Sequence, residues 1–173
     1  VLSGHYDAVI AGGGLAGVMA AAAASREGMK VLLVEKYGFL GGMATAGLVN
    51  PFMNFYERGG HGIFANAGLF KDLLERIHGL GGSKAPHAAS YMEEFMKLAL
   101  DRLCAEYGIK ILFHATVSDA DLRGGEIKNI TVSTCSGNIR LTAKVFADAT
   151  GDADLTAFCG LEYKLGRDED GLC

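Results

Sequence analysis

A glycine loop near the start of the chain places the tightest constraint on the fold. Gly12 and Gly14 stand between an apolar run over residues 6–11 and an alanine-rich stretch over residues 15–27, and Gly17 lies near the start of that stretch. The apolar run ends abruptly at the glycines, which predicts a buried strand followed by a tight turn. The alanines predict a helix, because alanine is the best helix former.

A second apolar run, over residues 31–34, predicts another buried strand, and Glu35 follows it directly. Strand, glycine turn, helix and strand form a βαβ unit, which implies a parallel sheet with a right-handed connection. In such a unit Gly12 permits the sharp turn, Gly14 lets a pyrophosphate approach the backbone, and Gly17 allows close packing of the helix. The helix N-terminus attracts phosphate charge. The loop therefore predicts a dinucleotide site, the alternative being a glycine turn without a ligand.

Glu35 also indicates which dinucleotide fits. An acid at the end of the second strand accepts hydrogen bonds from the ribose hydroxyls of an adenosine, and it disfavours a 2′-phosphate. NADP is therefore a poor fit to this sequence, whereas FAD and NAD both remain possible at this point.

The middle of the chain is less regular. Residues 37–61 show no clear period and contain several glycines, so we expect an extended, irregular segment, and long loops of this kind are often functional. Apolar residues at helical spacing predict an amphipathic helix over residues 66–78. A further helix is expected over residues 90–107, with Ser90 and Glu93 as a capping box.

The last third reads mostly as strands. Residues 109–113 predict a third parallel strand, and residues 115–121, 127–134 and 139–147 predict a three-stranded antiparallel excursion with glycine-containing turns. A short helix is expected over residues 153–159. The fold class is α/β: a Rossmann-like FAD/NAD(P)-binding domain in which a parallel sheet carries helices and the antiparallel excursion.

Composition excludes several other classes. The 173 residues suit one domain, 50% of them are hydrophobic, and the formal net charge of −4 gives no basic face for a nucleic acid. The longest apolar run, over residues 15–24, is too short to span a bilayer and is not a signal peptide. No two of the four cysteines form a CxxC pair, so reduced thiols in a cytoplasmic protein are expected.

No metal-ligand spacing or Ser/His/Asp order stands out, and the catalytic residues are unknown. His61, which lies in the irregular segment beside Gly60, has either a surface role or a place near a cofactor.

Two later motifs carry a family resemblance. Gly41-Gly42 alone indicates only a turn, but it opens the stretch Gly-Gly-Met-Ala-Thr soon after Glu35, and Ala149-Thr-Gly-Asp152 follows the antiparallel excursion. Together with the glycine loop, this series resembles the glutathione-reductase-type flavoproteins with two dinucleotide-binding domains. Within them it resembles a family of FAD-dependent oxidoreductases. The likeness extends over nearly the whole chain, from about residue 6 to residue 161.

The resemblance implies FAD as the cofactor and assigns roles to individual residues. The pyrophosphate would be contacted by Gly12, Gly14 and Gly17 with the adjoining Leu15 and Ala16. Glu35 would contact the ribose. Lys36 and the backbone of Val117 would lie beside the adenine. The glycine pair and the residues after it would follow the pyrophosphate and ribityl chain: Gly41, Gly42, Met43, Ala44 and Thr45. Ala149, Thr150, Gly151 and Asp152 would close over the cofactor. Asp152 has an alternative role as the N-cap of the helix that follows.

The resemblance also predicts how the chain is organised. Residues 1–173 correspond to the N-terminal portion of an FAD-binding domain, and neither a substrate domain nor a C-terminal closing segment is visible in the sequence. We expect an FAD-dependent oxidoreductase, or its FAD-binding portion, that transfers electrons or hydride to or from an unidentified small molecule. One alternative is a flavin-binding module or subunit completed by another chain, or by a second copy. The other is an NAD-dependent dehydrogenase, which the two later motifs disfavour.

Overall fold

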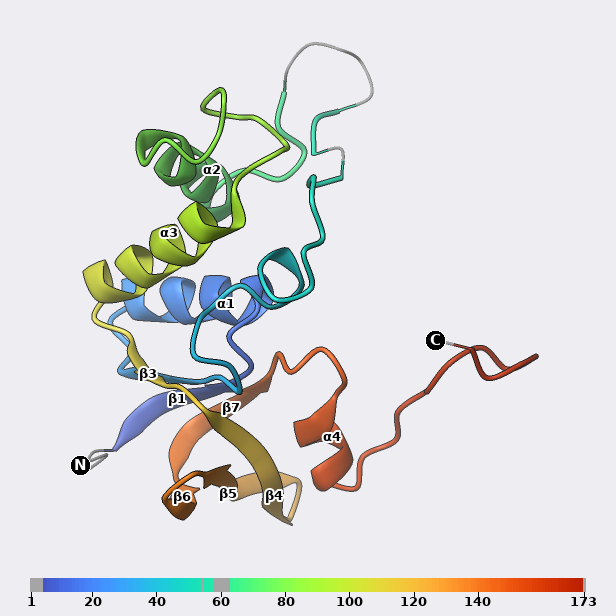
Figure 1. The fold of residues 1–173 in the computed structure, drawn as a ribbon. Coiled ribbons are helices and arrows are strands. Elements are labelled where there is room, and N and C mark those ends of the chain that lie inside the picture. Colours follow the sequence, from blue (N-terminus) through green and yellow to red (C-terminus); the bar gives the residue numbers. More distant parts are fainter. Residues whose placement is uncertain (1–4, 54, 58–62, 173) are drawn as a thin grey trace.

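The computed structural model describes residues 5–53, 55–57 and 63–172. In chain order the elements are β1 (Tyr6–Ala11), α1 (Leu15–Arg26), β2 (Val31–Val34), a 3-10 helix (Gly42–Ala44), α2 (Leu69–Gly79), α3 (Glu93–Glu106), β3 (Lys110–Leu112), β4 (Ala115–Arg123), β5 (Glu126–Thr134), β6 (Gly137–Leu141), β7 (Ala143–Asp148) and α4 (Asp154–Phe158). They form three layers, with α1, α2 and α3 above a parallel sheet and with an antiparallel sheet and α4 below it (Figure 1). The parallel sheet has the order β3-β2-β1-β7, and the antiparallel sheet has the order β4-β5-β6.

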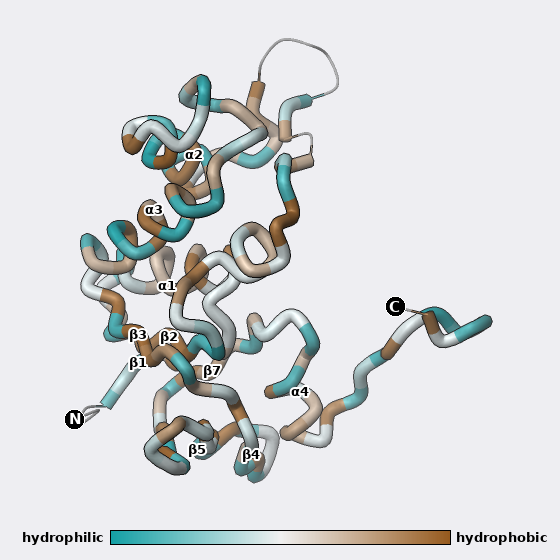
Figure 2. Tube along the Cα trace, in the orientation of Figure 1, coloured by the Kyte–Doolittle hydropathy of each residue, from teal (hydrophilic) through white to brown (hydrophobic). Residues whose placement is uncertain are grey.

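Strands β1 and β2 separate two hydrophobic cores. Ile10 and Leu33 face the helices, where they pack with residues of α1, α2 and α3. Val9 and Leu32 face the other way and pack against the antiparallel sheet and α4. A parallel strand covered on both faces is apolar at nearly every position, which is why these strands appear as almost continuous apolar runs in the sequence. Figure 2 shows this apolar band at the centre of the molecule.

The predicted α/β fold is confirmed, but the expected strand over residues 139–147 is wrong. The structure divides it at Thr142 into β6, which completes the antiparallel sheet, and β7, which joins the parallel sheet. Strand β7 runs parallel to β1, with Asp148 opposite Ala11. The Ala149 N–H continues the pairing by donating to the Ala11 carbonyl at 2.7 Å. The residues after β7 therefore reach the glycine loop after β1.

The helices match their predicted positions closely, with two corrections. α2 starts at Leu69 rather than at residue 66, directly after Gly68 with its φ of +67°. α3 begins at Glu93 with Met92 as N-cap and no capping side chain, so the predicted capping box at Ser90 is wrong. Glu93 instead accepts a 3.0 Å hydrogen bond from the Asn50 side-chain amide, which ties the irregular segment to α3. Within the described residues, no helix combines the length and apolar character needed to cross a membrane.

Candidate cofactor site

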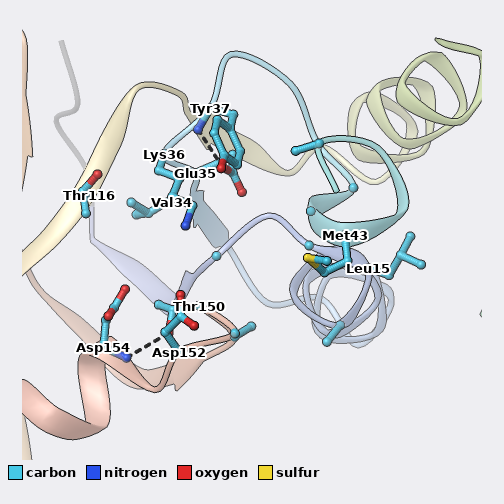
Figure 3. Close-up of a pocket in the computed structure, with 18 of the residues that line it drawn as sticks. Leu15, Val34, Glu35, Lys36, Tyr37, Met43, Thr116, Thr150, Asp152 and Asp154 are labelled. Atoms are coloured by element: carbon cyan, nitrogen blue, oxygen red, sulfur yellow. Dashed lines mark hydrogen bonds between the residues drawn. The ribbon is translucent and has the colours of Figure 1, made fainter. Parts of the chain in front are cut away.

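A cavity of about 460 Å³ opens at the carboxyl ends of β1, β2 and β7 (Figure 3). Ligands of open α/β sheets bind outside this edge, where the loops after the strands converge. Here the glycine loop, the turn after β2, the segment around the 3-10 helix, the start of β4 and the segment after β7 meet. The lining residues are Gly12, Gly14, Leu15, Ala16, Val34, Glu35, Lys36, Tyr37, Gly41, Gly42, Met43, Ala44, Ala46, Gly47, Ala115, Thr116, Val117, Ala149, Thr150, Gly151, Asp152 and Asp154.

Two of the three motif glycines are required by close backbone contacts. Gly12 has a φ of +102°, and a Cβ there would lie 2.2 Å from the carbonyl oxygen of Ala149. A Cβ on Gly17 would lie 1.8 Å from the carbonyl oxygen of Gly12. Only glycine at position 12 allows the loop to pass so close to the end of β7. Only glycine at position 17 allows α1 to pack against that loop. Gly17 itself does not line the cavity.

Gly14 differs, because its missing side chain leaves open space. Its φ of −64° suits any residue, and a Cβ would meet only the Cα of Gly42, at 3.9 Å. The Gly41 N–H donates a 2.8 Å hydrogen bond to the Gly13 carbonyl, which holds the two glycine loops together. The N-cap residue Gly14 makes no side-chain cap hydrogen bond, and the first turn of α1 contains no acidic residue. These loops form a side-chain-free cradle at a helix N-terminus, which fits a pyrophosphate.

Glu35 is buried and is held in place by the backbone. One carboxylate oxygen accepts a 2.7 Å hydrogen bond from the Gly13 N–H, and the other accepts one of 2.7 Å from the Tyr37 N–H. Each carboxylate oxygen can accept more than one hydrogen bond, so the side chain keeps acceptor capacity at the cavity that it lines. The geometry suits the ribose hydroxyls that the sequence predicts as partners of Glu35.

An aromatic side chain beside Glu35 was not identified from the sequence. The half-exposed Tyr37 lines the cavity and stacks on Phe39, with ring centroids 5.6 Å apart. The Lys36 ammonium lies 5.4 Å from the Tyr37 ring centroid. Val117 and the neighbouring Thr116 line the same cavity from β4. The sequence offers no signal for Tyr37 beyond its position two residues after Glu35.

Asp152 faces the cavity and is not a helix cap. The N-cap of α4 is Ala153, with a φ of +60° and no capping side chain of its own. The Asp154 N–H donates instead to the Thr150 hydroxyl at 2.9 Å. The alternative N-cap role of Asp152 is therefore wrong, and its exposed carboxylate is left among the lining groups (Figure 3).

Thr45 also differs from its expected role. The resemblance implies a cofactor contact, but Thr45 is buried outside the cavity, and its hydroxyl donates a 2.7 Å hydrogen bond to the Leu40 carbonyl. A Cβ on Gly41 would lie 2.5 Å from the Thr45 side chain. Thr45 thus supports the second glycine loop from beneath, while Met43 and Ala44 line the cavity. His61 lies outside the described residues.

Fold and cavity together define a dinucleotide-binding α/β protein. A family model described as FAD dependent oxidoreductase matches residues 7–173. The chain therefore belongs to this family of FAD-dependent oxidoreductases, and FAD is the family's cofactor. This match favours FAD over the nicotinamide alternative left open by the glycine loop.

Solved structures show the same fold at low sequence identity. THI4 of Thermovibrio ammonificans is 18% identical, with a TM-score of 0.63 over 95% of this chain and 67% of that chain. L-proline dehydrogenase of P. horikoshii is 16% identical, with a TM-score of 0.67 over 95% of this chain and 58% of that chain. The flavin-dependent brominase Bmp2 is 22% identical, with a TM-score of 0.63 over 91% of this chain and 41% of that chain.

The chain thus spans between 41% and 67% of the length of these three proteins. At such low identity the likeness shows the fold alone. Among curated proteins, none matches the chain.

Proposed function

We propose that this chain binds FAD in the cavity at the carboxyl ends of β1, β2 and β7, and that it serves an oxidoreductase acting on a small molecule. The observation that carries the proposal is the cradle of Gly14, Gly41 and Gly42 at the uncapped N-terminus of α1. A pyrophosphate needs close approach to backbone N–H groups and to the positive end of a helix, and the cradle offers both.

The other lining residues have distinct tasks in this proposal. Glu35 accepts hydrogen bonds from the ribose, with Lys36 and Val117 beside the adenine. Met43 and Ala44 continue the wall from the second glycine loop. The segment after β7 forms the opposite wall through Ala149, Thr150, Gly151 and Asp152, all of which line the cavity.

When bound, FAD supplies the electron or hydride transfer, and the protein supplies binding, orientation and electrostatics. The buried Glu35 carboxylate is fixed by two backbone hydrogen bonds, so ribose recognition costs little reorganisation of this side chain. The exposed carboxylate of Asp152 lines the cavity and is available to accept a hydrogen bond from a ligand.

We further propose that the chain belongs to the glutathione-reductase-type subgroup and corresponds to the N-terminal portion of its FAD-binding domain. Insertion of the antiparallel sheet between β3 and β7 supports this assignment. The proposal includes a second chain or a second copy as a partner, and a cytoplasmic location, which the absence of CxxC pairs favours.

Gly14→Ala tests the cradle without disturbing the fold. A methyl at Gly14 suits the backbone and meets only Gly42 Cα, so the variant should keep wild-type thermal stability. The same methyl enters the pyrophosphate cradle, so FAD affinity should fall by about tenfold or more, measured by the change in flavin fluorescence on titration. Gly79→Ala is the matched control, because its Cβ meets nothing within 4 Å and its φ is ordinary.

Wild-type protein that takes up no FAD under these conditions would contradict the proposal, as would equal affinity in Gly14→Ala. Reduction of the bound flavin by added substrates, followed by absorbance, then separates an enzyme from a binding module. In an enzyme the substrate reduces the bound flavin without a second chain, whereas in a binding module it does not.

A further inference from the structure

Asp148, the last residue of β7, accepts four hydrogen bonds although its side chain is exposed. One carboxylate oxygen accepts from the Thr150 N–H at 3.1 Å and from the Thr150 hydroxyl at 2.7 Å. The other accepts from the Thr156 N–H and hydroxyl, both at 2.8 Å. A single carboxylate thus joins the end of a strand, the turn after it and the first part of α4.

This arrangement replaces the missing cap of α4. Ala153 occupies the N-cap position in the left-handed region and has no side chain that can accept a hydrogen bond. The Thr156 N–H is satisfied by Asp148, and the Asp154 N–H is satisfied by the Thr150 hydroxyl, which itself donates to Asp148. The helix start is therefore fixed from the end of β7.

The residues fixed in this way form a wall of the cofactor cavity. Thr150 and Asp154 line the cavity, whereas Asp148 and Thr156 do not. The preceding Ala149 carbonyl leaves no space for a side chain on Gly12, so the wall lies directly against the glycine loop. A shift of this wall would therefore change the shape of the cavity beside Gly12.

We propose that Asp148 is a positioning residue that holds the segment from Ala149 to Asp154 in the conformation that binds FAD. The inference rests on the proposed function. Asp148 acts through Thr150 and Thr156 and does not itself line the cavity. Charged acceptors make stronger hydrogen bonds than neutral ones, so a carboxylate suits this role better than an amide.

The ionisation of Asp148 agrees with this geometry. Partial desolvation alone would raise its pKa, but the hydrogen bonds from Thr150 and Thr156 outweigh that effect and hold the pKa below its ordinary value. The carboxylate is therefore charged at neutral pH, and all four donors face the charged form.

The first experiment compares apo proteins by amide hydrogen exchange. In Asp148→Asn the amide nitrogen replaces one acceptor oxygen, so one threonine pair loses its partner. We expect the amide of the threonine that faces the new amide nitrogen, Thr150 or Thr156, to exchange about tenfold faster or more, with the Val9 amide in the core unchanged. Asp119→Asn, an exposed acid on β4 outside the cavity, should leave the exchange as in the wild type. Unchanged protection in Asp148→Asn would overturn the inference.

The second experiment measures FAD affinity in the same proteins. Asp148→Asn and Thr156→Val should each bind FAD about tenfold more weakly, while Thr156→Ser, which keeps the hydroxyl, should bind as the wild type does. Faster exchange with unchanged affinity, or equal loss in Thr156→Ser and Thr156→Val, would overturn the positioning role. A wild-type chain that binds no FAD would overturn the proposed function, and the exchange data would still decide whether Asp148 holds the segment.

Discussion

The backbone N–H of Gly13 donates a 2.7 Å hydrogen bond to the Glu35 carboxylate, so the acid after β2 holds the glycine loop after β1. A Cβ on Gly13 would lie 2.8 Å from the same carboxylate oxygen, which shows how closely the two segments pack. Glu35 therefore holds the glycine loop, and in the proposed function it also accepts hydrogen bonds from the ribose.

Glu35→Gln should weaken both the fold and FAD binding. Glutamine keeps one acceptor oxygen but turns its amide nitrogen toward either the Gly13 or the Tyr37 N–H, leaving that backbone donor without its partner. We expect the free energy of unfolding of the apo protein to fall by about 1–3 kcal/mol in urea titrations. Glu27→Gln, an exposed acid after α1, is the control and should change it by less than about 0.5 kcal/mol. Equal stability of the two variants would show that the Gly13 bond is dispensable.

Gly17→Ala should destabilise the protein, in contrast to Gly14→Ala. The new Cβ would lie 1.8 Å from the Gly12 carbonyl oxygen, and a backbone atom cannot move aside as a flexible side chain can. We expect a loss of about 3 kcal/mol, at the upper end of the cost of overpacking, measured by chemical denaturation of the apo protein. An unfolding midpoint like that of the wild type would mean that α1 can shift away from the loop.

Tyr91 provides a pH-dependent test of the loop after the 3-10 helix. Its hydroxyl lies 3.1 Å from the Ala44 carbonyl and 2.9 Å from the Val49 carbonyl, and it can donate to either. Desolvation, with a smaller effect of Glu93, raises the pKa of Tyr91 from 10.0 to about 12. Because the folded state favours the neutral phenol, its stabilising effect is complete below pH 10 and is lost as the pH rises toward 12.

Tyr91→Phe should therefore lower the free energy of unfolding by about 1 kcal/mol at neutral pH. The difference between wild type and variant should shrink between pH 10 and pH 12, measured by urea unfolding at a series of pH values. A difference that stays constant across this range would show that the phenol proton plays no part in holding the loop.

Cysteine reactivity should follow burial. Cys135 is exposed, whereas Cys104 is fully buried in the helical core. Desolvation, with a smaller effect of Asp101, raises the pKa of the Cys104 thiol to about 12, so almost none of it is thiolate at neutral pH. Brief iodoacetamide treatment of the native protein should label Cys135 and leave Cys104 unlabelled, as read by peptide mass spectrometry. Labelling of Cys104 at the rate of Cys135 would indicate that the helical core opens readily.

Local sequence signals predicted much of the fold. The glycine loop and the two apolar runs predicted β1, α1 and β2. Residues that are adjacent in the sequence determine both the turn and the burial of these strands. The boundary at Thr142 was missed, since the residues on both sides favour strands and only the choice of sheet separates β6 from β7. That choice depends on pairing with β1, which no local pattern records.

The site shows the same division between local and distant effects. Motif spacing identified Gly12, Gly14 and Glu35 as residues of one cavity wall. It did not reveal that Thr45 turns inward, because the acceptor for its hydroxyl is a backbone carbonyl five residues earlier. Asp148 was missed for a related reason. Its partner Thr156 lies beyond a turn whose shape depends on two left-handed residues, Gly151 and Ala153.

The pairing of β7 with β1 also determines when the cavity can form. One wall comes from the loop after β1 and another from the segment after β7, so the pocket is incomplete until residues 149–154 have joined the glycine loop. Contacts between residues so distant in sequence form slowly, because the intervening loop must close first. The appearance of bound flavin during refolding should accordingly report the pairing of β7 with β1 rather than the formation of the βαβ unit.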